Sequence, residues 1–144
     1  MLRKSIPALS LLFLCQFIFA QPSNDDCSNA IELAVGTSCL LEPYTNVDAT
    51  DEGESIAPVP SCGFYQGGDV WFNFEVPESG DFRIETTGSS TRWAIYSGNC
   101  GDFTELDCRR GGVNYSESAW SGESLFIRVF RFNSNLGNDF EICV

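Results

Sequence analysis

The 144-residue chain contains no histidine. Without an imidazole, the serine–histidine and cysteine–histidine arrangements of nucleophilic catalysis are excluded. The usual zinc sites are not expected either, because no two cysteines are spaced as in a CxxC pair. Paired carboxylates remain available in principle, but nothing in the sequence singles out one pair among the twenty acidic residues. We therefore expect a protein that is not an enzyme.

Basic residues are also scarce. Beyond residue 20 there is no lysine, and six arginines face twenty acidic residues, so residues 21–144 carry a net charge of −14. Such a surface repels the phosphates of nucleic acid and the headgroups of anionic membranes. We expect neither a nucleic-acid partner nor membrane insertion.

One long apolar run is present, and it lies at the start of the chain. Arg3 and Lys4 precede an almost unbroken apolar stretch over residues 6–19, and Ala20 follows it. This is the pattern of a secretory signal peptide, with cleavage after Ala20. We therefore predict a signal peptide at 1–20 and one domain at 21–144, secreted to the extracellular space or the cell surface and monomeric.

Six cysteines remain after the signal peptide: Cys27, Cys39, Cys62, Cys100, Cys108 and Cys143. An even number in an exported domain predicts three disulfides. Cys100 and Cys108 are close in sequence and Gly101 relaxes the turn between them, so we expect these two to pair. The other four cysteines allow three pairings, and the sequence does not select one.

Residues 67–77 form the segment around which the other elements are expected to be arranged. Val70, Phe72 and Phe74 alternate with polar or larger residues, which is the period of a strand with one buried face. A glycine pair precedes this strand and a proline ends it. We predict a central strand over residues 70–76, joined in a hairpin to a strand at 82–87.

Further short strands are expected along the rest of the chain. The segments are 39–44, an edge strand at 44–49, 93–96, 103–107, 116–120, 125–132 and 140–144, with a long loop over 51–67. Residues 30–35 fit either a short strand or a turn of helix, and six residues do not decide between them. No convincing helix appears beyond residue 20. Short strands with regular turn signals predict an all-β, disulfide-stabilised antiparallel β-sandwich, either jelly-roll or immunoglobulin-like.

Several of these segments resemble a known family. The opening at residues 24–33 and the segments 49–50, 60–63, 68–74, 95–101 and 127–129 follow in the order seen in pre-peptidase C-terminal-like domains of secreted and surface proteins of Bacteroidetes-type bacteria. The resemblance implies a small non-catalytic β-sandwich that accompanies enzymes or adhesins. Relatives often have aspartates where this chain has Arg109 and Arg110, and an aspartate near Arg92.

The candidate binding residues are large rings and arginines. Trp71 is on the strand face opposite Val70 and Phe72, so we predict that it is exposed, whereas Trp93 is interpreted as core. Exposed rings in sandwich domains stack on sugars or anchor protein partners. Arginines beside them can hold a carboxylate, although arginines more often pair with neighbouring acids. The predicted ligand-binding residues are Trp71, Arg109, Arg110, Tyr115 and Trp120.

Acidic residues in two loops are candidate calcium ligands. Asp25, Asp26, Asp48 and Asp51 offer the oxygen atoms that calcium prefers, without the spacing of an EF-hand. The alternative interpretation is a solvated acidic loop, and we expect no cofactor.

Together these features predict a secreted, non-catalytic binding or adhesion module for a glycan or a cell-surface protein. The alternative is a structural or maturation segment of an exported enzyme or adhesin, with no ligand of its own. The sequence leaves open whether the domain stands alone or belongs to a longer protein.

Overall fold

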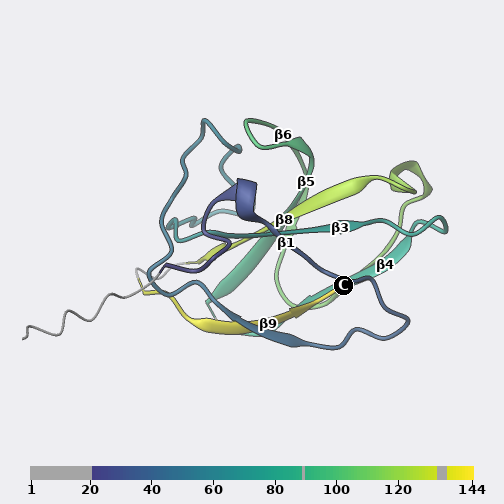
Figure 1. Cartoon of the computed structure of the whole chain (residues 1–144), viewed down its shortest axis with the longest axis horizontal. Helices are drawn as coiled ribbons and strands as arrows, with labels where there is room; N and C mark the ends of the chain where they lie inside the picture. Colours follow the sequence, from purple (N-terminus) through teal and green to yellow (C-terminus); the bar gives the residue numbers. More distant parts are fainter. Residues whose placement is uncertain (1–20, 89, 133–135) are drawn as a thin grey trace, which may run out of the picture.

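Two β-sheets packed face to face form the protein (Figure 1). The computed structural model describes residues 21–88, 90–132 and 136–144, so the predicted signal peptide lies outside the described residues. In these ranges the chain forms nine strands and two short 3-10 helices. Neither helix of the described ranges has the length and apolar character needed to span a membrane. The predicted all-β sandwich is confirmed.

The larger sheet has five strands in the order β1-β3-β8-β5-β6 and the smaller has four in the order β2-β9-β4-β7. The larger contains β1 (Ile31–Glu32), β3 (Val70–Glu75), β5 (Thr91–Asn99), β6 (Asp102–Arg109) and β8 (Ser124–Arg131). The smaller contains β2 (Glu42–Thr45), β4 (Asp81–Thr86), β7 (Val113–Ser116) and β9 (Asp139–Cys143). The 3-10 helices are η1 (Cys27–Asn29) and η2 (Ser118–Trp120).

Consecutive strands lie in opposite sheets, except for the β5–β6 hairpin. Neighbouring strands are antiparallel, apart from β1, which runs parallel to β3. Strands β2–β9 have the connectivity of a jelly roll, in which eight strands pass between two antiparallel sheets. β1 is an additional strand at the edge of the larger sheet. Of the two predicted sandwich types, the jelly roll is therefore the one that forms.

This alternation makes the predicted hairpin between residues 70–76 and 82–87 wrong. The chain does turn tightly at 77–80, where Gly80 has φ +75° and donates its N–H to Pro77. The turn passes the chain from β3 in one sheet to β4 in the other. β3 instead pairs with β8 from Val70–Val129 to Glu75–Ser124, and it is an inner strand as predicted.

The main core fills the space between the sheets. Its fully buried side chains include Val70, Phe72, Ile84, Trp93, Ile95, Leu125, Ile127, Val129 and Ile142. Trp93 is therefore core, as interpreted from the sequence, and its ring nitrogen donates a hydrogen bond to the Gly111 carbonyl at 3.1 Å. Removing one of the large side chains from such a core typically costs about 3–5 kcal/mol.

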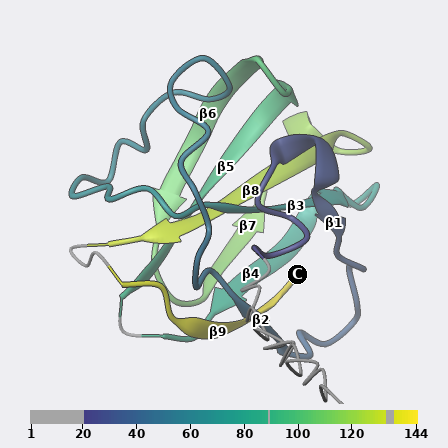
Figure 2. The same ribbon diagram turned by 60° about the vertical axis from the view of Figure 1, so that its left-hand side comes forward.

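A second apolar layer lies on the outer face of the larger sheet. The coil over residues 46–69, called here the covering loop, crosses this face between β2 and β3 (Figures 1 and 2). Beneath it lie Trp71, Tyr96 and Phe130, all fully buried. The predicted exposure of Trp71 is therefore wrong, because the loop covers the face that the alternation marked as outward.

Three disulfides form, as predicted, but the local pairing of Cys100 with Cys108 is wrong. The bridges are Cys27–Cys100, Cys39–Cys143 and Cys62–Cys108. Cys100 lies in the β5–β6 turn, whereas Cys108 lies near the far end of β6. Six residues of extended strand place them roughly 20 Å apart, and a disulfide needs Cα atoms within about 7 Å. The bridge from Cys62 fastens the covering loop to β6.

Candidate binding site

Three of the five predicted binding residues lie together at the edge of the sandwich between β6 and β7. Tyr115 stacks on Phe82 with ring centroids 4.8 Å apart, and its ring lies 5.9 Å from Trp120. The Tyr115 hydroxyl donates to Asp107 at 2.8 Å, and Arg109 forms a 3.2 Å ion pair with the same carboxylate. The half-buried rings of Tyr115 and Trp120 therefore cover the edge of the core, and Arg109 lies beside them, paired with Asp107.

Arg110 has different surroundings from Arg109. Arg109 is the last residue of β6 and lies opposite the core residue Trp93 in the β5–β6 register. Arg110 directly follows the strand and is exposed, and its charge lowers the pKa of Arg92 in β5. The two arginines, which the sequence analysis treated as a pair, therefore have different neighbours: Asp107 for Arg109 and Arg92 for Arg110.

The Arg92 side chain belongs to a surface cluster that we call the phenylalanine–arginine patch, made of Phe64, Arg92, Arg110 and Phe132. The Cζ of Arg92 lies 3.6 Å from the centroid of the Phe132 ring. The Phe64 ring meets Phe132 edge-on at 5.7 Å, and 71% of Phe64 is exposed. Two aromatic rings and two cations therefore gather on one surface.

Four segments that are distant in the sequence supply this patch. Phe64 comes from the covering loop, Arg92 from β5, and Arg110 and Phe132 directly follow β6 and β8. A bridge between Tyr65 and Phe132 holds the loop against the end of β8. Phe64 has φ +52°, in the left-handed region that non-glycine residues rarely occupy.

The patch is positively charged. Among the described residues, no acidic side chain lies within 4.0 Å of the guanidinium of Arg92 or Arg110. The Nε of Arg92 is buried without a hydrogen-bond partner. Burial, and then the charge of Arg110, lower the pKa of Arg92 from its ordinary value. An anion bound next to Arg92 would stabilise the charged form of its side chain and so oppose both effects.

A buried ionic network next to the patch holds the covering loop in place. Arg128, only 1% exposed, forms an ion pair with the buried Asp69 and donates a hydrogen bond to the Tyr65 hydroxyl. Its Nη1 donates to the Pro58 carbonyl at 3.2 Å. The Arg128 guanidinium also lies between the rings of Tyr65 and Trp71, 4.7 and 5.3 Å from their centroids. Tyr65, one of these partners, directly follows Phe64 in the sequence.

The two titratable partners of Arg128 have shifted pKa values. Burial raises the pKa of Asp69 to about 6, against the lowering effect of the Arg128 charge. Burial and the Asp69 charge raise the pKa of Tyr65 well above its ordinary value. The Tyr65 hydroxyl lies 2.6 Å from the Asp69 carboxylate and 2.7 Å from that of Asp51. At neutral pH the network therefore contains a neutral tyrosine and an ionised Asp69.

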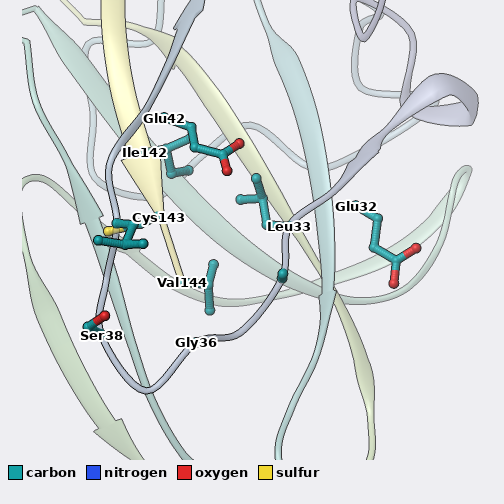
Figure 3. A pocket seen from close by; sticks show the side chains of 10 residues that line it. Glu32, Leu33, Gly36, Ser38, Glu42, Ile142, Cys143 and Val144 are labelled. Carbon is teal, nitrogen blue, oxygen red and sulfur yellow. The ribbon is translucent and has the colours of Figure 1, made fainter.

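A separate hollow of about 280 Å³ lies at the opposite edge of the sandwich, between β1 and β2 (Figure 3). Leu33, Ile142 and Val144 line it, and Glu32 and Glu42 flank it (Figure 3). The Cys39–Cys143 bridge fixes the loop that closes it. Its lining contains neither an aromatic ring nor a cation, so it has no feature in common with the patch.

The four candidate calcium ligands do not form one site. Asp25 is buried and accepts hydrogen bonds from the backbone N–H and hydroxyl of Thr50, at 2.6 and 2.8 Å. Asp26 and Asp48 are exposed, and Asp51 accepts from Tyr65. In the ranges that the structure describes, no three acidic or cysteine side chains gather as metal ligands would. Calcium binding by these residues stays a hypothesis.

Sequence reasoning did not assign a binding role to Phe64, Arg92 or Phe132. Phe64 was the one detectable signal, because it is an aromatic residue in an otherwise turn-rich loop. Arg128 lies on the face of β8 opposite Leu125 and Ile127, where the strand pattern does not predict a buried charge. Its burial depends on the covering loop, which no local pattern indicates.

The fold and this surface define a disulfide-linked jelly-roll module of the binding or accessory class. A family model described as Galactose binding domain-like, and associated by name with the type IX secretion system, matches residues 23–142. The chain belongs to this family, whose fold is a non-catalytic binding fold. No curated protein and no solved structure matches the chain. A Bacteroidetes-type surface domain is thus supported, whereas membership of the pre-peptidase C-terminal-like group is not confirmed.

Proposed function

We propose that the protein is a secreted carbohydrate-binding module and that a sugar ring stacks on Phe64. The observation that carries this proposal is the exposure of Phe64 in a left-handed backbone conformation. Such a conformation costs about 1–3 kcal/mol and persists only where the surrounding structure enforces it. Burying the ring would be the ordinary outcome for a phenylalanine.

The neighbours of Phe64 support this role. The Cys62–Cys108 bridge precedes it and the Tyr65–Arg128 contact follows it, so both sides of the ring's backbone are fastened. A ring held in advance loses little conformational freedom when a ligand binds. Phe132 meets Phe64 edge-on, and this contact further restrains the Phe64 ring.

The test is binding of residues 21–144, with disulfides intact, to an array of neutral and acidic glycans. Phe64→Ala is compared with Leu40→Ala, because Leu40 is a similarly exposed apolar residue at 74%, beside the hollow of Figure 3. We expect Phe64→Ala to weaken glycan binding about five- to tenfold, and Leu40→Ala to leave it unchanged. Neither substitution should lower the unfolding temperature.

Two outcomes would reject the proposal. Binding of no glycan by the unsubstituted protein would favour the alternative of a structural or maturation segment. Equal glycan binding by Phe64→Ala and the unsubstituted protein would place the sugar elsewhere on the surface.

A further inference from the structure

We propose that the ligand of the phenylalanine–arginine patch is an acidic sugar, with its carboxylate held by Arg92 and Arg110 and its ring on Phe64. This inference rests on the proposed function and specifies the chemical class of the ligand. A uronic acid is the simplest sugar of this kind, because its carboxylate projects from the ring that stacks.

The first argument comes from how the protein uses its other arginines. Each of the other four has an acidic or carbonyl partner: Arg83 pairs with Glu85, Arg109 with Asp107, Arg128 with Asp69, and Arg131 donates to the carbonyls of Gly67 and Ala49. Arg92 and Arg110 alone among these six lack any such partner in the described residues, although acids outnumber arginines twenty to six. Because two adjacent cations repel each other, the position of Arg92 next to Arg110 does not stabilise the fold.

The second argument is the way in which Arg92 is positioned. Its guanidinium rests on the face of Phe132, which restrains the side chain without using its terminal N–H groups. A restrained guanidinium offers two parallel N–H donors that match the two oxygens of a carboxylate. Arg110 is exposed beside it and adds a second charge-assisted donor.

The third argument is the contrast with the rest of the surface. Residues 21–144 carry a net charge of −14, so an anionic ligand is repelled at most positions. At physiological ionic strength charges are screened beyond about 8 Å, and the arginine pair therefore dominates at the patch itself. This arrangement selects a ligand with one carboxylate near the patch over a densely charged polyanion.

The test compares matched sugars that differ only in the carboxylate. Neutral oligosaccharides that end in a single galacturonate, glucuronate or mannuronate are titrated into the protein by calorimetry, alongside their carboxyl-reduced counterparts. We expect at least one acidic oligomer to bind about tenfold more tightly than its reduced form, the value of one charge-assisted hydrogen bond.

The variants are Arg92→Gln and Arg110→Gln, with Arg109→Gln as the matched control, because Arg109 is paired with Asp107. Each of the first two should remove most of the tenfold preference, and the control should keep it. Equal binding of acidic and reduced oligomers, or a preference that survives both substitutions, would overturn this inference and leave the proposed sugar binding intact. Binding of none of these sugars would also overturn this inference, whereas the proposed sugar binding is rejected only if no glycan of the array binds.

Discussion

Replacing Arg128 with methionine gives the most demanding test of how the covering loop is held. Arg128 is 1% exposed, and Asp69 beside it is fully buried. Methionine preserves much of the side-chain volume between the Tyr65 and Trp71 rings but leaves the Asp69 charge unpaired. Breaking one side of a buried ion pair in this way costs about 3–5 kcal/mol.

The cost should differ between the two partners. In Asp69→Asn, Arg128 retains its contacts with Pro58 and Tyr65 and lies 3.5 Å from Asp51, so we expect a loss of only about 1–3 kcal/mol. In the double variant no buried charge is left unpaired, so it should be less destabilised than the sum of the two single losses by at least about 1 kcal/mol.

Urea unfolding followed by tryptophan fluorescence measures these differences, because Trp71 contacts the network directly. A loss of 4 kcal/mol corresponds to a fall of roughly 10–20 °C in the unfolding temperature of a domain of this size. An Arg128→Met protein within 1 kcal/mol of the unsubstituted protein would refute the idea that this ion pair secures the loop. Additive single losses would refute direct coupling between Arg128 and Asp69.

Three further predictions concern the same region. Because burial raises the pKa of Asp69 to about 6, above roughly 3.9 in the unfolded chain, the folded state binds the extra proton between these values. The free energy of unfolding should therefore fall as the pH rises from about 4 to 6, and Asp69→Asn should reduce that slope; an identical slope in the variant would contradict this. Peptide mapping without reduction should recover Cys62 linked to Cys108, and a Cys100–Cys108 peptide would contradict the structure. Replacing both Cys62 and Cys108 with serine should cost about 2–4 kcal/mol in urea unfolding, whereas a loss below 1 kcal/mol would show that the bridge does not stabilise the fold.

Most of the longer strands were predictable from the sequence because they have a strong local pattern, whereas β7 was not predicted. Val70, Phe72 and Phe74 indicate the buried face of β3, and the same alternation indicates β8. The pairing of these strands was not predictable, because a short turn fits a hairpin as well as a passage between sheets. The segment predicted as a strand at 116–120 is instead the end of β7 followed by η2.

The candidate site was predictable only in its chemistry. An aromatic and arginine surface was expected, and Arg110 is part of the patch. Trp71 failed as an exposed candidate because its burial depends on contacts made across the fold, whereas ligand binding by Arg109, Tyr115 and Trp120 stays a prediction. The covering loop buries Trp71, and Asp107 engages Arg109. The alternation of residues along a strand shows which side chains share a face, but it does not show whether a distant loop covers that face.

The position of β9 has a consequence for the order of events in folding. β9 lies between β2 and β4, and Cys143 at its end is bonded to Cys39, 104 residues earlier. A chain synthesised from its N-terminus must therefore complete residues 139–143 before β2 acquires its neighbour in the sheet. Until then Cys39 remains a thiol available to any other sulfur it meets. Maturation of the domain thus waits for β9, so assistance from a disulfide-exchange catalyst would act after residue 143 has been synthesised.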